Sequence, residues 1–222
     1  MILVLDTATR TPVVALAQAD GTLAGERRWP SLHRHDEELL LKLDELLTEV
    51  GATRADLKAV VVGTGPGSFT GLRIGLATAK TIAYALSLPI VGVSSSLAMA
   101  AAATPEENEV VVTLPAGASD RYVHRIKVGD GHAAEKQAPK LVGDSNMGVD
   151  DIAVDMENAP AKARERGEKA VAGLAGALAR LGAERLAGGQ SDDVAQLVPA
   201  YVALPRGIAK AAAEMEWSPD LR

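Results

Sequence analysis

Apolar runs and polar breaks alternate along the chain in a way that predicts short strands followed by longer helices. Apolar runs at 2–8 and 13–18, and a third at 22–29 after an Asp-Gly turn signal, predict a sheet that begins with a β-hairpin. Leucines at helical spacing predict a helix over 35–51, and a compact apolar run predicts a buried strand over 58–63.

The alternation continues to about residue 103. The pattern predicts a helix over 70–88, a strand over 90–93 and a third helix over 94–103 that begins with capping serines. Strands and helices that alternate in this way after a hairpin are typical of an α/β fold.

A polar, turn-forming stretch at 103–109 indicates a hinge between two halves. Strands predicted over 110–115 and 121–128, with a third after the next turn, repeat the order seen at the start of the chain. We therefore expect two α/β subdomains, 1–104 and 105–222, the second a degenerate copy of the first.

The rest of the second half is harder to assign. Apolar residues on one face predict a helix over 167–183, and this last helix can pack back on the first subdomain. The stretch 139–166 carries no clear pattern, and the tail 209–222 predicts a short helix at most.

Composition narrows the function classes. The chain has a net charge of −6, 47% apolar residues and no cysteine. These values argue against a broad basic surface for nucleic acid and exclude disulfides and thiolate metal sites. The apolar N-terminus contains an early aspartate and is predicted to be a strand rather than a signal peptide. No apolar run reaches about 18 residues, so we expect no membrane span. The absence of cysteine fits a reducing compartment, and we expect a cytoplasmic location.

The stretch GTGPGSFTGLRIG at 63–75 is the most distinctive motif. A Walker A loop requires a lysine after its last glycine, but Leu72 follows Gly71 here. A dinucleotide-binding fingerprint requires a different spacing from that of Gly65, Gly67 and Gly71. Both common phosphate-binding interpretations therefore fail.

Two interpretations of this loop remain open. Free N–H groups at the start of the 70–88 helix would favour an anion, with Ser68 or Thr70 as the N-cap. The simpler interpretation is a tight turn between a strand and a helix.

The helix after the loop carries a face of small residues. Gly71, Gly75, Ala79 and Ala83 recur every four residues, although glycine inside a helix costs about 1 kcal/mol relative to alanine. Such a face predicts the close approach of another helix, either the leucine-rich 35–50 helix or a helix of a partner.

Several motifs together identify a family resemblance. The segment 59–97, LDTAT at 5–9, His35 before the leucine-rich helix and PAYVALP at 199–205 resemble the TsaB (YeaZ) family of bacterial tRNA threonylcarbamoyladenosine biosynthesis proteins. The similarity is most specific in 59–97 and loose after residue 105.

The resemblance implies an actin/Hsp70-like (ASKHA) fold of two duplicated α/β subdomains. It also implies a non-catalytic scaffold for the complex that forms N6-threonylcarbamoyladenosine at position 37 of ANN-decoding tRNAs. The implied partners are the catalytic, metal-bearing paralogue TsaD, the small P-loop ATPase TsaE and, through the complex, tRNA; a homodimer is implied when the chain is alone. No cofactor or metal is expected on this chain itself, and ATP or ADP with Mg²⁺ is expected only in the assembled complex.

The resemblance places the partner contact on two helices and the glycine loop. The implied docking residues are His35, Leu39, Leu43, Pro66, Gly67, Ser68, Phe69, Thr70, Gly71, Arg73, Gly75 and Ala79. Asp6 and Thr7, at the end of the first strand, are candidates for a cleft contact to a nucleotide. The alternative for this pair is a turn in which the aspartate accepts backbone N–H bonds.

This sequence also departs from the family pattern. Pro115 and Gly117 stand where family members carry an aspartate and an arginine in a hairpin, which makes independent ATP chemistry less expected. A nucleotide-dependent small kinase of the same superfold is the alternative function.

Three other candidate sites are weaker. A peptidase would pair Ser68 or one of 94–96 with His35, but no G-x-S-x-G elbow is present. The two histidines of HRH at 33–35 supply too few ligands for a typical metal site. The basic run KARERGEK at 162–169 is more typical of a solvated helix face than of an RNA contact.

Overall fold

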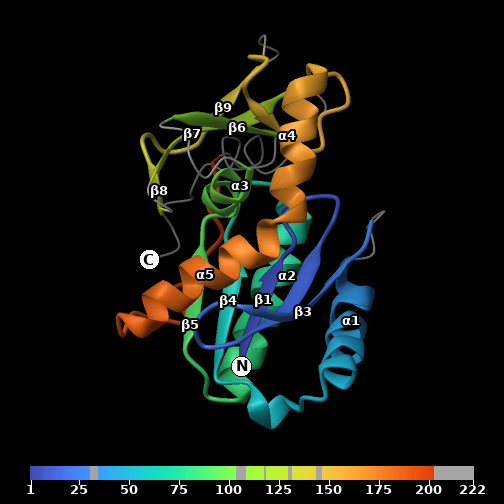
Figure 1. Cartoon of the computed structure of the whole chain (residues 1–222), viewed down its shortest axis with the longest axis vertical. Helices are drawn as coiled ribbons and strands as arrows, with labels where there is room; N and C mark the ends of the chain where they lie inside the picture. The colour runs from blue at the N-terminus through green and yellow to red at the C-terminus, as the bar shows by residue number, and fades with distance from the viewer. Residues whose placement is uncertain (31–34, 104–108, 118, 130–131, 144–146, 203–222) are drawn as a thin grey trace, which may run out of the picture.

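The computed structural model is an α/β protein with two sheets (Figure 1). It describes residues 1–30, 35–103, 109–117, 119–129, 132–143 and 147–202. The predicted boundary at 104/105 lies outside the described residues. Within the described chain, no helix is both long and apolar enough to cross a membrane.

The first sheet has five strands in the order β3-β2-β1-β4-β5. They are β1 (Ile2–Asp6), β2 (Val13–Ala17), β3 (Leu23–Arg28), β4 (Ala59–Gly63) and β5 (Ile90–Val93). β1 pairs antiparallel with β2 and parallel with β4, which in turn pairs parallel with β5. Every residue of β1, β2 and β4 is buried, because helices cover both faces; this is why these strands are continuous apolar runs.

Helices α1 (His35–Val50) and α2 (Phe69–Ala85) cover one face of this sheet. Leu3 and Leu5 of β1 point into the core on this side, together with Leu39 of α1 and Leu76 of α2. The alternate residues of the strand point to the other face, as the two-residue period of a strand requires.

The other face of the first sheet is covered by α5 (Leu174–Ala187), which comes from the second half of the chain (Figure 1). The helix lies very close to the sheet: a Cβ atom on Gly182 would lie 2.3 Å from Cγ2 of Val61. Small residues on α5 therefore allow a tight helix–sheet contact.

The second sheet repeats most of the first. Its strands are β6 (Val110–Pro115), β7 (Arg121–Gly129), β8 (His132–Glu135), β9 (Lys140–Val142) and β10 (Ile152–Ala153). The main strand order is β10-β6-β7-β8. β6 pairs antiparallel with β7, as β1 does with β2, and it pairs parallel with β10, as β1 does with β4. The expected fold of two duplicated α/β subdomains, the second degenerate, is confirmed.

The helical region of the second half differs from the prediction of one helix over 167–183. Two helices are present, α4 (Ala161–Ala172) and α5, and Gly173 separates them. The N–H of Gly173 still donates to the Lys169 carbonyl, and a Cβ atom there would lie 2.9 Å from Cβ of Ala102. The bend therefore fits the contact with α3 (Ser95–Ala103), which packs against α4, α5 and the second sheet.

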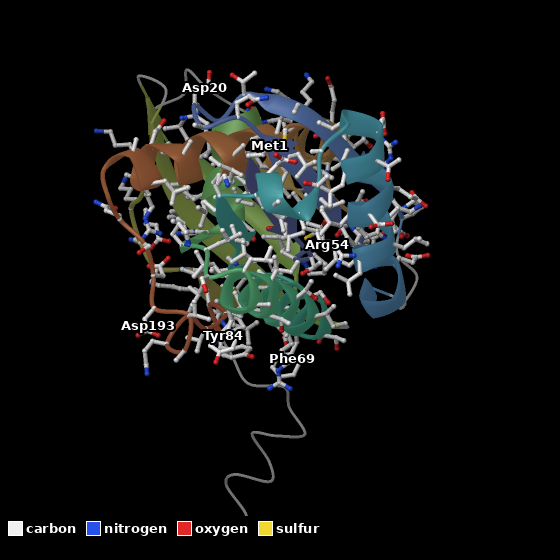
Figure 2. All side chains as sticks on the ribbon, turned by 90° about the horizontal axis from the view of Figure 1, so that it is seen from below. Met1, Asp20, Arg54, Phe69, Tyr84 and Asp193 are labelled. Carbon is white, nitrogen blue, oxygen red and sulfur yellow. The ribbon has the colours of Figure 1, made fainter. Side chains whose placement is uncertain are left out.

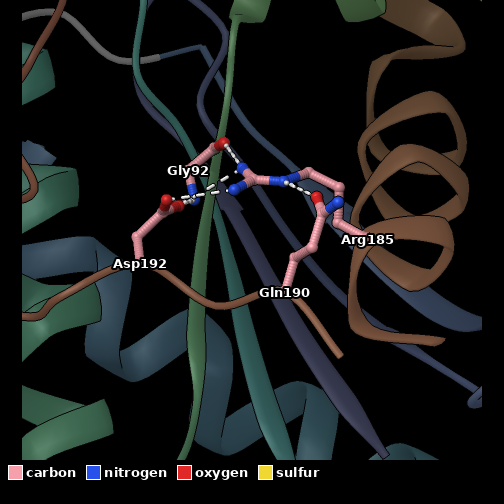
Figure 3. Close-up of polar contacts among 4 residues, drawn as sticks. All are labelled: Gly92, Arg185, Gln190 and Asp192. Carbon is pink, nitrogen blue, oxygen red and sulfur yellow. Dashed lines mark hydrogen bonds and ion pairs between the residues drawn. The ribbon is translucent and has the colours of Figure 1, made fainter. Parts of the chain in front are cut away.

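The free edge of β5 is covered by the segment that follows α5 (Figure 3). The Asp192 N–H donates to the Ile90 carbonyl at 2.8 Å, and the Asp192 carboxylate accepts from the Gly92 N–H at 2.7 Å. Arg185 donates to the Gly92 carbonyl at 2.7 Å and pairs with Asp192 at 3.0 Å. These bonds satisfy edge groups that would otherwise be open to another strand.

Candidate functional site

The glycine loop connects β4 to α2 and lies against the turn after β1. The Ser68 N–H donates to the Ala8 carbonyl at 2.8 Å, and a Cβ atom on Gly67 would lie 2.3 Å from the same oxygen. Gly65 has φ +96°, a conformation that favours glycine. Gly65 is thus needed for the turn, and Gly67 is needed for the close approach of the loop backbone to Ala8.

Ser68 is the N-cap of α2, as the sequence predicts. Its Oγ accepts a hydrogen bond from the Gly71 N–H at 3.1 Å, so one of the free donors at the helix start is already satisfied. Thr70, the alternative cap, lies inside the first turn and is exposed.

The small-residue face of α2 is turned into the protein, where it packs against the end of β1 instead of being exposed. Gly71, Gly75 and Ala79, together with Ala83, are buried. The glycines lie over Thr7, whose Oγ1 donates to the Gly71 carbonyl at 2.7 Å. These small residues allow α2 to approach the end of β1, which leaves no space for a partner helix.

Other implied docking residues are also buried. Leu39 is fully buried, Leu43 nearly so, and both contribute to the core beneath α1 and α2. Pro66 and Gly67 are buried in the loop. His35 is the first residue of α1, and its side chain lies outside the described part of the chain, as do residues 33 and 34.

The exposed surface of the two helices instead carries a different set of apolar residues. Leu40 and Leu41 of α1 are 57% and 55% exposed, and Tyr84 of α2 is 81% exposed. Leu40 directly follows the buried Leu39, and Tyr84 directly follows the buried Ala83. Neighbouring positions can differ in this way because successive helix residues point in directions about 100° apart. Together with Leu86, the three exposed residues make up half of the eight exposed large hydrophobic side chains in the described chain.

A groove of about 510 Å³ runs between these two helices, and we call it the docking groove. Its lining residues are Leu40, Leu41, Leu43, Asp44, Leu47, Arg54, Leu57, Thr81, Ile82, Ala85 and Leu86. Figure 2 views this side of the molecule and labels Phe69 and Tyr84 along α2 and Arg54 near α1. Apart from Asp44 and Arg54, which lie 3.8 Å apart, the lining is almost entirely apolar.

Phe69 and Arg73, two more of the implied docking residues, contact the chain's own C-terminal segment. The Arg73 guanidinium lies 3.8 Å from the ring centroid of Phe69, and its Nε donates to the Tyr201 hydroxyl at 3.1 Å. Lys80 donates to the Leu197 carbonyl at 3.0 Å. The segment 195–201, which includes the start of the PAYVALP motif, therefore lies along α2 and occupies part of its outer surface; the end of the motif, 203–205, lies outside the described residues.

Asp6 and Thr7 are buried and bonded within the chain. The two carboxylate oxygens of Asp6 accept from the Ala8 N–H at 2.8 Å and from the Ser95 hydroxyl at 2.5 Å. Burial raises the pKa of Asp6 to about 6, against the lowering effect of these two hydrogen bonds. This geometry is the one that the turn interpretation expects, and it leaves no free oxygen directed at a ligand.

The structure also brings together a serine and a histidine that the sequence did not pair. Ser96 Oγ lies 2.6 Å from Nδ1 of His124, and His124 Nε2 lies 3.8 Å from a carboxylate oxygen of Glu135. Ser96 and His124 are both completely buried, so no substrate can reach the hydroxyl. The contact joins α3 to β7, and no spacing in the sequence indicates it.

The basic run on α4 makes local ion pairs. Lys162 pairs with Asp150, and Lys169 pairs with Glu165, at the exposed surface. This arrangement is that of a solvated helix face. Among the residues that the structure describes, no group of three His, Cys, Asp or Glu side chains is placed to hold a metal ion.

Comparison with known proteins places these features in a family. The family model TsaD, tRNA N6-adenosine threonylcarbamoyltransferase, matches residues 30–200. The tRNA threonylcarbamoyladenosine biosynthesis protein TsaB of Escherichia coli is 39% identical over 99 residues, 45% of this chain and 42% of that protein. The protein of the same name from Bacillus subtilis is 38% identical over 100 residues, 45% of this chain and 43% of that protein.

These alignments span less than half the length of the curated relatives. The structure of YeaZ from Pseudomonas aeruginosa superposes with a TM-score of 0.70 and 22% identity, covering 90% of this chain and 98% of that chain, which supports the fold. The family model covers well over half of the chain. Its curated relatives include proteins named TsaB. The chain therefore belongs to the family described as TsaD, tRNA N6-adenosine threonylcarbamoyltransferase.

Proposed function

We propose that the protein acts in the formation of N6-threonylcarbamoyladenosine in tRNA, as a non-catalytic subunit that docks onto a TsaD-type catalytic partner through the docking groove. Relatives from three bacteria carry the name tRNA threonylcarbamoyladenosine biosynthesis protein TsaB. A relative from Streptococcus pneumoniae, 32% identical over 114 residues, is named tRNA N6-adenosine threonylcarbamoyltransferase. The observation that carries the docking role is the exposed apolar groove between α1 and α2.

The groove suits an apolar helix of another protein. Leu40, Leu41 and Leu86 are exposed at its margins, and its lining is mostly aliphatic. Burying one large aliphatic side chain contributes about 1.5–3 kcal/mol, so a few such contacts supply much of the binding free energy of an ordinary complex. A helix that lies in an apolar groove is a common mode of recognition between proteins.

The non-catalytic role is supported by the positions of the candidate reactive groups. Both oxygens of Asp6 are bonded inside the protein, and Ser96 and His124 are sealed from solvent. The glycine loop places Leu72 where a phosphate-binding lysine would stand. We propose that ATP or ADP with Mg²⁺, the P-loop ATPase TsaE and tRNA are engaged only in the assembled complex, and that the chain alone pairs with itself.

Co-expression with the TsaD-type protein of the same organism tests the proposal. The two proteins should co-elute on size exclusion. In an assay that supplies TsaE, ATP with Mg²⁺ and a threonylcarbamoyl donor, modification of tRNA should require both proteins. Leu41→Glu and Leu86→Glu each place a charge in the apolar groove and should weaken the complex by about 100-fold, measured by calorimetric titration.

Val149→Glu is the matched control, because Val149 is 58% exposed but lies in the second half of the chain. It should bind the partner as the unmodified protein does. A complex that tolerates both groove substitutions would show that another surface docks. ATP turnover by the isolated chain would favour the kinase alternative instead.

A further inference from the structure

A second pocket, of about 410 Å³, lies where the two halves of the chain meet, and we call it the seam pocket. The first half contributes the turn after β1, with Arg10, and the end of β3, with Arg28. The second half contributes the loop after β10 and one side of α4. Pockets between two structural units are common places for small ligands.

Direct bonds between the halves form one wall of the seam pocket. The Arg10 N–H donates to an Asp155 carboxylate oxygen at 2.7 Å, and the Arg10 guanidinium pairs with Glu157 at 3.2 Å. Asp155 has φ +55°, a left-handed conformation that is uncommon for a residue other than glycine. Such backbone strain is found more often at binding sites than elsewhere.

The charges that α4 contributes to the pocket are arranged differently. Arg164 and Glu168 both line the pocket, and they lie four residues apart on α4, so they share one face of the helix. Within the described chain, neither side chain forms an ion pair with the other or with any third group. By contrast, Glu165 and Lys169, also four residues apart on α4, pair with each other at 2.9 Å.

An apolar patch accompanies the two unpaired charges. Met156 and Val171 line the same pocket and supply a surface for an aliphatic group. A guanidinium matches the geometry of a carboxylate, and a carboxylate pairs with an ammonium group. The pocket therefore presents one site for a carboxylate, one site for a cation a single helical turn away, and an apolar patch.

We propose that the seam pocket binds a small zwitterion with an apolar body, of the size of a free amino acid. The carboxylate of the ligand lies on Arg164, its ammonium group lies on Glu168, and its aliphatic part contacts Met156 and Val171. All four contacts come from the second half of the chain, and the turn after β1 and the end of β3 enclose the ligand from the first half. The proposal concerns a surface separate from the docking groove, and its test needs no partner protein.

The test is titration of the isolated full chain with L-leucine, followed by NMR or calorimetry. We expect saturable binding with a Kd on the order of 1 mM, as suits a ligand of this size at an open pocket. Two analogues, 4-methylpentanoate without the ammonium group and 3-methylbutylamine without the carboxylate, should each bind at least about tenfold more weakly, because each loses one charged contact.

Variants on α4 locate the ligand. Arg164→Gln and Glu168→Gln should each weaken L-leucine binding by about tenfold or more. Glu165→Gln and Lys169→Gln remove the charges of the neighbouring pair on the same helix and should leave the binding constant unchanged. No saturable binding at 20-fold the expected Kd, or binding that is indifferent to the Arg164 and Glu168 substitutions, would overturn the proposal.

Discussion

Thr7 and Gly75 are in such close contact that a Cβ atom on Gly75 would lie 2.1 Å from Thr7 Oγ1. The same threonine donates a hydrogen bond to the Gly71 carbonyl, one turn earlier on α2. Two glycines inside a helix therefore have a structural reason: they allow the helix to lie directly on the end of β1.

Gly75→Ala should destabilise the protein, although alanine is the better helix former. The added methyl group overlaps Thr7 Oγ1, and the hydrogen bond to Gly71 must shift to accommodate it. Overpacking of this kind costs about 1–3 kcal/mol, more than the roughly 1 kcal/mol that alanine gains in helix propensity. Urea unfolding measures the difference.

Gly176→Ala is the matched control within α5. A Cβ atom there would meet its nearest heavy atom, Leu23 Cδ1, at 3.8 Å, which is ordinary contact. This variant should be more stable than the unmodified protein by about 0.5–1 kcal/mol. Equal effects of the two substitutions would mean that Gly75 has no special contact with Thr7.

Asp6→Asn should change the pH dependence of stability. Burial raises the pKa of Asp6 from 3.8 to about 6, so between these values the folded state holds the proton more tightly than the unfolded state. The protonated Asp6 therefore contributes its full stabilisation of the folded state below pH 3.8, and this contribution is lost as the pH rises to about 6. The stability of Asp6→Asn relative to the unmodified protein should rise by up to about 3 kcal/mol across this window.

Asp20→Asn supplies a contrast of the opposite sign. The exposed Asp20 has a lowered pKa because its carboxylate accepts the Thr22 N–H, so its contribution to stability is lost as the pH falls. Chemical denaturation at pH 4 and pH 7 compares the two variants. A difference for Asp6→Asn that does not change with pH would show that the carboxyl group is not penalised by burial.

Loss of the contact between Ser96 and His124 should make the junction of α3 and β7 less stable. Ser96→Ala leaves Nδ1 of a fully buried imidazole without its partner, which costs about 1–3 kcal/mol. Ser68→Ala is the comparison variant, because Ser68 is only partly buried and acts as an N-cap. Its removal should cost about 1 kcal/mol. Neither serine should affect tRNA modification beyond its effect on stability.

Protonation of His124 lowers the stability of the folded state, whereas protonation of Asp6 raises it. Burial lowers the pKa of His124, and Glu135 opposes this effect only in part. The unfolded state then binds the proton more readily, so stability falls as the pH drops below the ordinary histidine value of about 6.5. His124→Asn should remove this loss, which thermal unfolding at pH 7 and pH 5 measures.

Parts of the fold follow directly from the apolar pattern. Continuous apolar runs predicted β1, β2 and β4 because these strands are buried on both faces, and leucine spacing predicted α1 because one side of that helix meets the core. The bend at Gly173 and the two-residue strand β10 were missed. Both are decided by packing against segments far away in the sequence, and neither leaves a periodic pattern.

The surface residues were harder to predict than the elements that carry them. Periodicity identified a leucine face on α1, but Leu39 belongs to the core, and Leu43 lines the docking groove although it is almost buried. Leu40 and Leu41 are the exposed leucines of the groove. The small-residue face of α2 indicated a close contact, and spacing alone could not say whether its neighbour was a partner or the chain's own Thr7. Contacts between distant elements decide both questions.

Asp192→Ala should expose the edge of β5. The carboxylate of Asp192 accepts the Gly92 N–H at 2.7 Å and pairs with Arg185, which itself donates to the Gly92 carbonyl. Without it, the Gly92 amide should exchange with solvent faster by about tenfold or more, since a charge-assisted hydrogen bond contributes about 1.5–3 kcal/mol. Asp193→Ala is the control, because Asp193 accepts the Ala195 N–H in the next turn. Hydrogen exchange at Gly92 that is as slow in Asp192→Ala as in Asp193→Ala would show that the backbone contact at Ile90 suffices to hold this edge.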